Sequence, residues 1–133
     1  MPRVAIIILN WRGWRDTIEC LESLSRIDYD NFEVIVVDNA SGDESVPKIK
    51  EYFKNLLTHL PAQAGYSLLI TKKNLGFAGG NNVGVKEALD KDAEYILLLN
   101  NDTTVDKNFL KELIRVGESD KKIGILGPLI YYF

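Results

Sequence analysis

Short apolar runs alternate along the chain with longer segments in which apolar residues recur every three or four positions. The runs cover residues 4–9, 32–37, 67–70, 95–99 and 123–127. Each run is continuous rather than alternating with polar residues, which is typical of strands buried on both faces of a parallel sheet. The pattern therefore predicts five parallel strands.

The intervening segments have the periodicity of amphipathic helices. In the first, Leu21 and Leu24 mark the inner side, and Asp16 or Thr17 is the expected N-terminal cap. Further helices are predicted over residues 45–57, 79–89 and 107–116, and the longest aperiodic connection spans residues 58–66. Strict alternation of strands and helices predicts an α/β fold, with a mostly parallel, Rossmann-like sheet and helices on both of its faces. No repeat or linker divides the chain, so we expect one domain.

The composition and net charge of the chain exclude some classes of function. The chain has 133 residues and a formal net charge of −3, from 16 Lys and Arg against 19 Asp and Glu. It lacks the basic surplus that attracts phosphate backbones, so we expect no nucleic-acid partner. Cys20 is the single cysteine, which favours a reduced, cytoplasmic location and a buried, unreactive thiol over a reactive one. No apolar stretch approaches the roughly 20 residues that span a bilayer, so contact with the inner membrane face is expected only through other segments or partners.

Polar residues gather where four of the predicted strands end, at residues 10–13, 38–43, 72–82 and 100–102. The carboxyl ends of parallel strands lie at one edge of an open α/β sheet, and ligands bind beyond that edge. Any one of these clusters is explained by an ordinary turn. Four clusters at the same edge favour a ligand site.

Two of the clusters contain carboxylates with specific chemistry. Asp38 directly follows a strand, where it can accept hydrogen bonds from a ribose or a base. The alternative is an Asx turn or a helix cap, although Asp43 is better placed as the cap. After Asn100 and Asn101, Asp102 can hold Mg²⁺ or Mn²⁺ together with diphosphate oxygens and water, or it can simply belong to a turn.

A third cluster is rich in glycine. The glycines at positions 76, 79, 80 and 84 match neither the dinucleotide fingerprint nor a P-loop. They permit close approach of a phosphate or nucleoside, or equally the close packing of a helix. Phe77 lies among them and is expected to pack inside the protein rather than to stack on a base.

Taken together, four motifs resemble those of the inverting, nucleotide-sugar-dependent glycosyltransferases of family 2, which have the GT-A fold. The motifs are VAIIILNW, VIVVDNASGD, NLGFAGGNNVG and YILLLNNDTTVD, and the resemblance covers nearly the whole chain. The segments NWRGW, DNASGD and NNDT look most like the rhamnosyltransferase-like branch, which builds surface polysaccharide.

The resemblance implies a role for each matching position. The residues implied to bind the nucleotide sugar are Leu9, Asn10, Trp11, Asp38, Asn74, Gly80, Asn100 and Asn101. Asn100-Asn101-Asp102 matches the family's D-x-D motif, with Asp102 as the metal ligand. Asn100 departs from the motif because it carries an amide in place of the first acid. A neutral amide attracts a metal ion less strongly than a carboxylate does.

The resemblance also implies a reaction that these residues do not complete. The sugar of a UDP- or dTDP-sugar would pass to a saccharide or lipid-linked acceptor, with a carboxylate as general base. In the family that base lies further on than residue 133, and Asp106 and Glu112 look like capping or solvated positions. We therefore expect residues 1–133 to form the donor half of a GT-A domain, with the acceptor half absent and no catalytic residue in this chain.

Two other functions are considered. A non-catalytic nucleotide-sugar-binding or regulatory module with the same fold is an alternative. A nucleotidyltransferase is disfavoured, because those enzymes carry a basic glycine-rich loop after the first strand and NWRGW is not one. The apolar segment 129–133 and an uncovered sheet edge favour self-association. The sequence names neither the sugar nor the base nor the acceptor.

Overall fold

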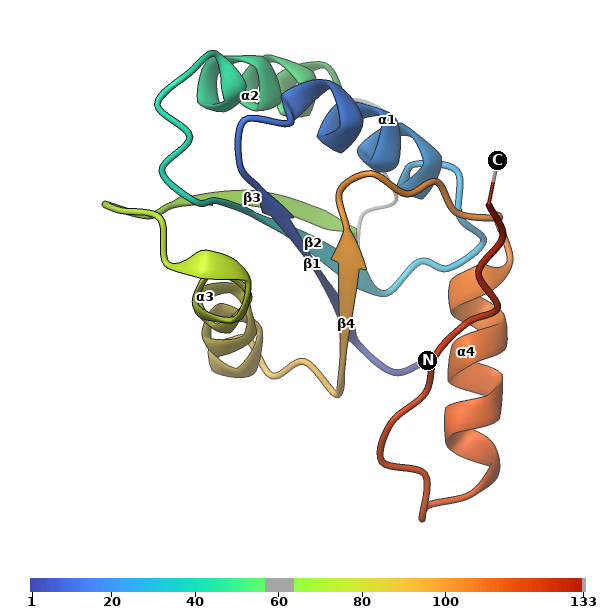
Figure 1. Cartoon of the computed structure of the whole chain (residues 1–133). Helices are drawn as coiled ribbons and strands as arrows, with labels where there is room; N and C mark the ends of the chain where they lie inside the picture. Colours follow the sequence, from blue (N-terminus) through green and yellow to red (C-terminus); the bar gives the residue numbers. More distant parts are fainter. Residues whose placement is uncertain (57–63, 133) are drawn as a thin grey trace.

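Four strands and four helices alternate in the computed structural model, which describes residues 1–56 and 64–132. The strands are β1 (Val4–Asn10), β2 (Phe32–Asp38), β3 (Gly65–Ile70) and β4 (Tyr95–Asn100), and the helices are α1 (Trp14–Leu24), α2 (Ser45–Leu56), α3 (Gly76–Asp90) and α4 (Phe109–Ser119). The strands form one parallel sheet in the order β3-β2-β1-β4 (Figure 1). The predicted α/β class and parallel sheet are confirmed.

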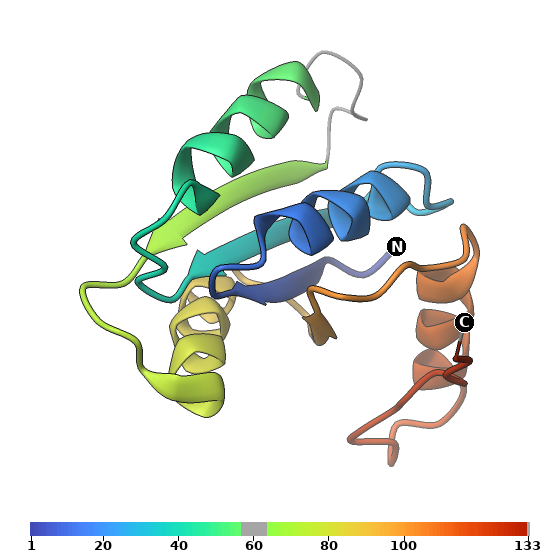
Figure 2. The same cartoon turned by 45° about the horizontal axis from the view of Figure 1, so that its top comes forward.

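The two central strands are apolar on both of their faces. All residues of β2 are buried, and β1 is buried except at Leu9, which is half-buried. Alternate side chains of β1 enter two separate cores, because Ile6 and Ile8 pack with α1, α2 and α4, whereas Ile7 packs with α3. Figure 2 shows the sheet between these layers, with α1 and α2 on one face, α3 on the other and α4 beside β4. The strands all end at one edge, where the polar clusters meet.

Helix α3 lies so close to the sheet that two of its positions have room only for glycine. A Cβ atom on Gly84 would lie 2.5 Å from Cγ2 of Ile7, and one on Gly80 would lie 2.4 Å from Cδ1 of Leu9. Carbon atoms cannot approach so closely without displacing a neighbour. The helix-packing interpretation of the glycine-rich cluster is therefore confirmed for this pair. The helix begins at Gly76, three residues before the predicted start.

The predicted fifth strand is wrong. Residues 123–127 form no strand in the structure and return along α4, where Leu126 Cδ1 lies 3.2 Å from the Cβ position of Gly117. An apolar run becomes a strand only when its backbone pairs with a neighbouring strand. Here the run packs one side against the helix and leaves Ile125 94% exposed. Among the described residues, α4 is therefore the last helix or strand.

The cap expected for the first helix is also wrong. Helix α1 begins at Trp14, with Gly13 as its N-cap and no side-chain hydrogen bond to the cap. Asp16 and Thr17 therefore lie inside the first turn. The Thr17 hydroxyl donates instead to Oδ1 of Asn10 at 2.8 Å, which links the helix to the end of β1.

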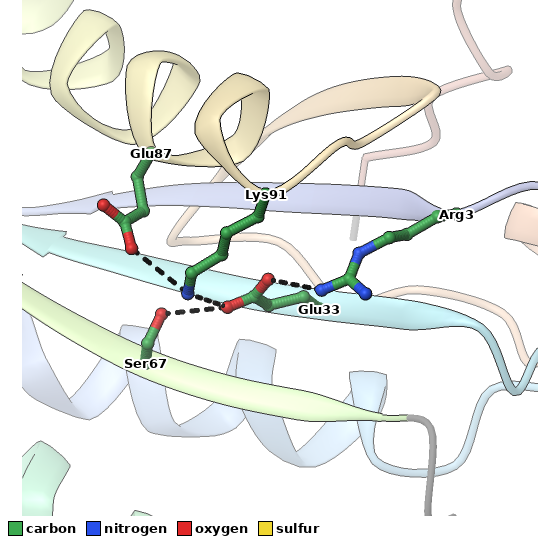
Figure 3. Close-up of polar contacts among 5 residues, drawn as sticks. All are labelled: Arg3, Glu33, Ser67, Glu87 and Lys91. Atoms are coloured by element: carbon green, nitrogen blue, oxygen red, sulfur yellow. Dashed lines mark hydrogen bonds and ion pairs between the residues drawn. The ribbon is translucent and has the colours of Figure 1, made fainter.

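A network of charged residues joins the elements at the opposite, amino-terminal edge of the sheet (Figure 3). Only 10% of the Glu33 side chain is exposed, and its carboxylate pairs with Lys91 at 2.5 Å and Arg3 at 3.2 Å. Ser67 donates to the same carboxylate at 3.5 Å, and Lys91 also pairs with Glu87 at 3.1 Å. The network thus connects the N-terminal arm, β2, β3 and the end of α3.

Parts of two predicted elements lie outside the described residues. These are residue 57 of the second helix and residues 58–63 of the long connection. Within residues 1–56 and 64–132, no helix is both long and apolar enough to cross a membrane.

Candidate functional site

The ends of β1 and β2 are joined by a buried polar cluster. Asn10 and Asp38 are 0% and 1% exposed, and the Asn10 amide donates to Oδ1 of Asp38 at 2.8 Å. Ser41 donates its hydroxyl to the same oxygen at 2.6 Å and its backbone N–H to Oδ2 at 3.1 Å. The turn interpretation of Asp38 is therefore confirmed, while a bond from Asp38 to a ligand stays a prediction. Asp43, the better cap candidate, accepts a hydrogen bond from the N–H of Ser45, the first residue of α2, at 2.8 Å.

Asn39 holds the loop between β3 and α3 in place. Its amide nitrogen donates to Oδ1 of Asn74 at 3.0 Å and to the carbonyl of Gly76 at 3.1 Å. Its amide oxygen accepts from the N–H of Leu75 at 2.9 Å. Sequence reasoning missed this residue, because its partners lie more than 30 positions away and only its place beside Asp38 hinted at a role. Asn74 is thus tied to the end of β2, at the edge where the resemblance places it.

The loop after β1 presents an aromatic side chain at the same edge. Trp11 is 52% exposed, and the guanidinium carbon of Arg12 lies 5.2 Å from the centroid of its ring. Arg12 has a φ of 55°, an unusual value for a residue with a side chain, and its Nε donates to the carbonyl of Ser41 at 3.0 Å. Contacts with Ser41, in the loop that follows β2, therefore hold this loop in place and leave the indole accessible.

The end of β4 forms a turn, as one of the two interpretations predicted. Thr103 donates its hydroxyl to the carbonyl of Asn100 at 2.7 Å. The amide of Asn101 points back to α1 and donates to Oγ1 of Thr17 at 3.1 Å. Asp102 is exposed. The turn thus leaves Asp102 accessible and commits Asn101 to a contact within the protein.

Two hollows of contrasting character flank this turn. The first, of about 290 Å³, is called the acidic hollow and is lined by Asp16, Glu19, Asp102, Thr103 and Thr104. The second, of about 100 Å³, is called the neutral hollow and is lined by Leu9, Phe77, Asn81, Leu98, Leu99, Asn100 and Asn101. Phe77 is 65% exposed, so the expectation that it packs inside is wrong. Phe77 lies in the first turn of α3 and lines the neutral hollow.

The side chains that line the acidic hollow are of the kind that binds hard cations, but they do not surround a complete metal site. Carboxylates from α1 and from the β4 turn face it, and oxygen donors are what Mg²⁺ and Mn²⁺ prefer. Among the described residues, no three His, Cys, Asp or Glu side chains are close enough together to hold a metal ion alone. The residues fit an ion that Asp102 shares with the oxygens of a bound ligand.

Cys20 lies under the turn and takes no part in this chemistry. It is fully buried, and burial raises the pKa of its thiol to about 11. A thiol with such a pKa is protonated at neutral pH and is a poor nucleophile. The prediction of a buried thiol is confirmed.

The catalytic candidates of the fourth helix are placed as predicted. Asp106 is exposed and accepts a hydrogen bond from the N–H of Asn108 at 2.8 Å. Glu112 is exposed and pairs with Arg115 at 2.8 Å. Neither acid lines the two hollows.

Comparisons with known proteins identify the family and the fold. The chain belongs to glycosyl transferase family 2, whose family model matches residues 4–133. The hexosyltransferase Agl10 of low-salt glycan biosynthesis in Haloferax volcanii is 28% identical over 128 residues, covering 96% of this chain and 36% of that protein. The poly(ribitol-phosphate) β-N-acetylglucosaminyltransferase TarS of Staphylococcus aureus is 29% identical over 115 residues, covering 84% of this chain and 18% of that protein. The chain thus spans about a third or less of these relatives.

Solved structures show the same fold. A mannosyltransferase from Pyrobaculum calidifontis, solved with GDP-Man and Mn²⁺, has a TM-score of 0.75 at 21% identity, covering 86% of this chain and 32% of that one. Residues 1–349 of TarS have a TM-score of 0.71 at 24% identity, covering 88% of this chain and 32% of that one. The sheet with its covering helices is therefore the GT-A fold.

Proposed function

We propose that this chain forms the donor side of an inverting glycosyltransferase, which binds a nucleotide-diphosphate sugar together with Mg²⁺ or Mn²⁺. The observation that carries the proposal is the exposed Asp102 at the end of β4, where it shares the acidic hollow with Asp16 and Glu19. Family membership supports it, as do the neighbours solved with GDP-Man and Mn²⁺ or with UDP-GlcNAc.

The ligand would extend along the carboxyl edge of the sheet. Trp11 offers an accessible aromatic face for the nucleoside, and Asp38, oriented by Asn10, is proposed to bond the base or ribose. Asn74 would border the nucleotide from the neighbouring loop. Asp102 would hold the metal, whose charge stabilises the departing diphosphate.

Transfer requires a second substrate and a base. In the proposed reaction, an acceptor hydroxyl attacks the anomeric carbon from the face opposite the diphosphate, and the carbon–oxygen bond to the diphosphate breaks. The base and the binding site for a saccharide or lipid-linked acceptor are proposed to lie in the part of the protein that corresponds to the unmatched length of the relatives. A cytoplasmic location and a role in surface polysaccharide synthesis belong to the same proposal.

Thermal unfolding with nucleotides tests the proposal. UDP, dTDP and GDP are each added with and without Mn²⁺, and we expect at least one to raise the melting temperature, since a ligand at 100 times its Kd adds about 2.7 kcal/mol of stability. Asp102→Asn should remove the Mn²⁺-dependent part of the increase. Asp90→Asn, at the far end of α3, serves as the control and should retain it. Unchanged melting with every nucleotide at millimolar concentration would refute the proposal.

A further inference from the structure

The outer edge of β3 has backbone groups that no neighbouring strand uses. Within the part of the chain that the structure describes, β3 pairs only with β2. The N–H of Thr71, directly after β3, donates to the carbonyl of Asp38 in β2 at 3.0 Å. Because backbone groups alternate in direction along a strand, those of Tyr66, Leu68 and Ile70 point away from β2. Their N–H and C=O groups can therefore pair with another strand.

The side chains of these three residues lie on the face of the sheet that α2 covers. Tyr66 and Leu68 pack against the larger core, and the ring of Tyr66 lies 5.6 Å from that of Phe53 in α2. Ile70, nearer the carboxyl end, is 53% exposed. Helix α2 thus lies over β3, and Ile70 offers apolar surface to a strand that adds at the open edge.

Two lysines of α2 lie on the side of the helix that faces away from α1. The opposite side is marked by Lys48, whose Nζ lies 5.5 Å from the ring centroid of Trp14 in α1. Positions one before and one after a buried residue lie on opposite sides of a helix, so Lys50 follows buried Ile49 on the outer side, as does Lys54 one turn later. Figure 2 shows α1 and α2 side by side, with α2 farther out, above β3.

Two more lysines stand at the carboxyl end of the same edge. Lys72 and Lys73 follow β3 in the chain, and both are exposed. The four edge lysines are Lys50, Lys54, Lys72 and Lys73. None of them forms an ion pair or a side-chain hydrogen bond with a described residue, whereas Lys91 does. Helix α2 contains three lysines and a single acid, Glu51, so this edge is positively charged in a chain of net charge −3.

The open backbone and the unpaired cations together define a partner. The N–H and C=O groups of a strand edge are matched by another extended peptide strand, and not by a lipid headgroup. Lysines at an edge disfavour a basic strand and the same edge of a second copy, which is how proteins commonly avoid edge-to-edge association. A strand that carries carboxylates is attracted by the same charges.

We propose that the outer edge of β3 binds an acidic peptide segment of a partner protein, which adds to the sheet as a further strand beside the edge lysines. The backbone groups of Tyr66, Leu68 and Ile70 would supply the hydrogen bonds, and the lysines would select carboxylates. This inference does not depend on the proposed function, because none of these three residues lines either hollow.

Peptide titration monitored by NMR tests the proposal. The probe is a short peptide that alternates glutamate with threonine, a residue that favours strands, and its control carries lysine in place of each glutamate. We expect the acidic peptide to slow amide hydrogen exchange at Tyr66, Leu68 and Ile70. Ser67 and Leu69 should not change, because their N–H groups already face β2. The lysine peptide should bind roughly tenfold or more weakly.

Two double variants separate the edge lysines from lysines elsewhere. Lys50→Gln combined with Lys54→Gln should weaken binding of the acidic peptide roughly threefold to tenfold, the effect of two exposed ion pairs. Lys121→Gln combined with Lys122→Gln is the matched control, since it removes the same charge from the exposed segment after α4, and binding should stay within about twofold.

Several results would overturn the inference. One is the absence of binding by the acidic peptide at millimolar concentration, and another is equal binding of the acidic and lysine peptides. Binding that leaves amide exchange at Tyr66, Leu68 and Ile70 unchanged would show that the lysines attract anions without strand addition. Binding of phosphatidylglycerol vesicles without binding of the peptide would assign the surface to a membrane. Equal weakening by the two double variants would remove the role of the edge lysines.

Discussion

The side-chain amide of Asn10 lies 2.8 Å from the carboxylate of Asp38, and both residues are buried at the ends of adjacent central strands. Asn10→Ala removes one donor from a buried charge. We expect a loss of about 1–3 kcal/mol in the free energy of unfolding, measured with urea. Asn31→Ala, which removes an exposed bond to the carbonyl of Met1, should cost much less. Equal losses of stability in Asn10→Ala and Asn31→Ala would show that the buried hydrogen bond contributes no more than the exposed one.

Glu33 should matter more than any exposed acid. Glu33→Gln leaves the ammonium of Lys91 and the guanidinium of Arg3 without their shared carboxylate, and we expect a loss of roughly 1–3 kcal/mol, below the full cost of a buried pair because both cations are partly exposed. Glu22→Gln breaks an exposed pair with Arg26 and should cost roughly 0–0.5 kcal/mol.

The same network predicts a pH dependence. Hydrogen bonding to Glu33 raises the pKa of Lys91 above its usual 10.5. A raised lysine pKa means that the contribution is complete below pH 10.5 and is lost as pH rises through the higher folded-state pKa. Lys91 stays protonated in both the folded and the unfolded protein between pH 7 and 9. The difference in the free energy of unfolding between wild type and Glu33→Gln, measured with urea, should therefore stay constant over this range. A difference that vanishes within that range would contradict the assignment.

Gly84→Ala should destabilise the protein by about 1–3 kcal/mol through overpacking. The added methyl group meets Ile7, which is fully buried in the core between β1 and α3. Gly124→Ala is the control, because a Cβ there meets nothing within 4 Å, and its stability should match the wild type. A neutral Gly84→Ala would mean that α3 can move away from the sheet.

Cys20 should resist alkylation until the protein unfolds. At pH 8 the folded thiol is protonated and buried, so we expect iodoacetamide to react roughly tenfold or more slowly than in urea. Because the folded pKa of about 11 exceeds the ordinary 9.0, stability should fall as pH rises from 9 through 11. Rapid labelling of folded protein at pH 8 would contradict the burial of this thiol.

The exposed apolar segment near the C-terminus should promote self-association. Leu129, Ile130 and Tyr131 are 73–76% exposed, and Tyr132 is 98% exposed. We expect light scattering to show a mass that rises with concentration, and Ile130→Lys to reduce that rise. A clean monomer at high concentration would count against this prediction.

Local patterns located the four strands and four helices but not the contacts between them. Continuous apolar runs located all four strands. Burial on both faces explains the runs of β1 and β2, whereas β3 and β4 are only partly buried. The run at residues 123–127 failed because pairing, and not apolarity, makes a strand. The hydrogen bonds of Asn39 and the contact between Asn101 and Thr17 join residues more than 30 positions apart, and no local pattern encodes such partners.

Other errors concern side chains whose surroundings depend on tertiary packing. The general habit of phenylalanine predicts that Phe77 is buried, whereas the structure leaves it 65% exposed beside a hollow. Asp38 was correctly placed at the end of its strand, but its burial follows from Asn10 and Ser41 on either side.

The charged network around Glu33 and the two hollows lie at opposite edges of the sheet, separated by the length of strands of six or seven residues, roughly 20 Å. This separation has a practical use. A fluorophore or a surface attachment placed near the amino-terminal edge would report on the protein or immobilise it while leaving the opposite edge open to solvent. Binding assays on a sensor chip can therefore be designed without obstructing the residues that they are meant to test.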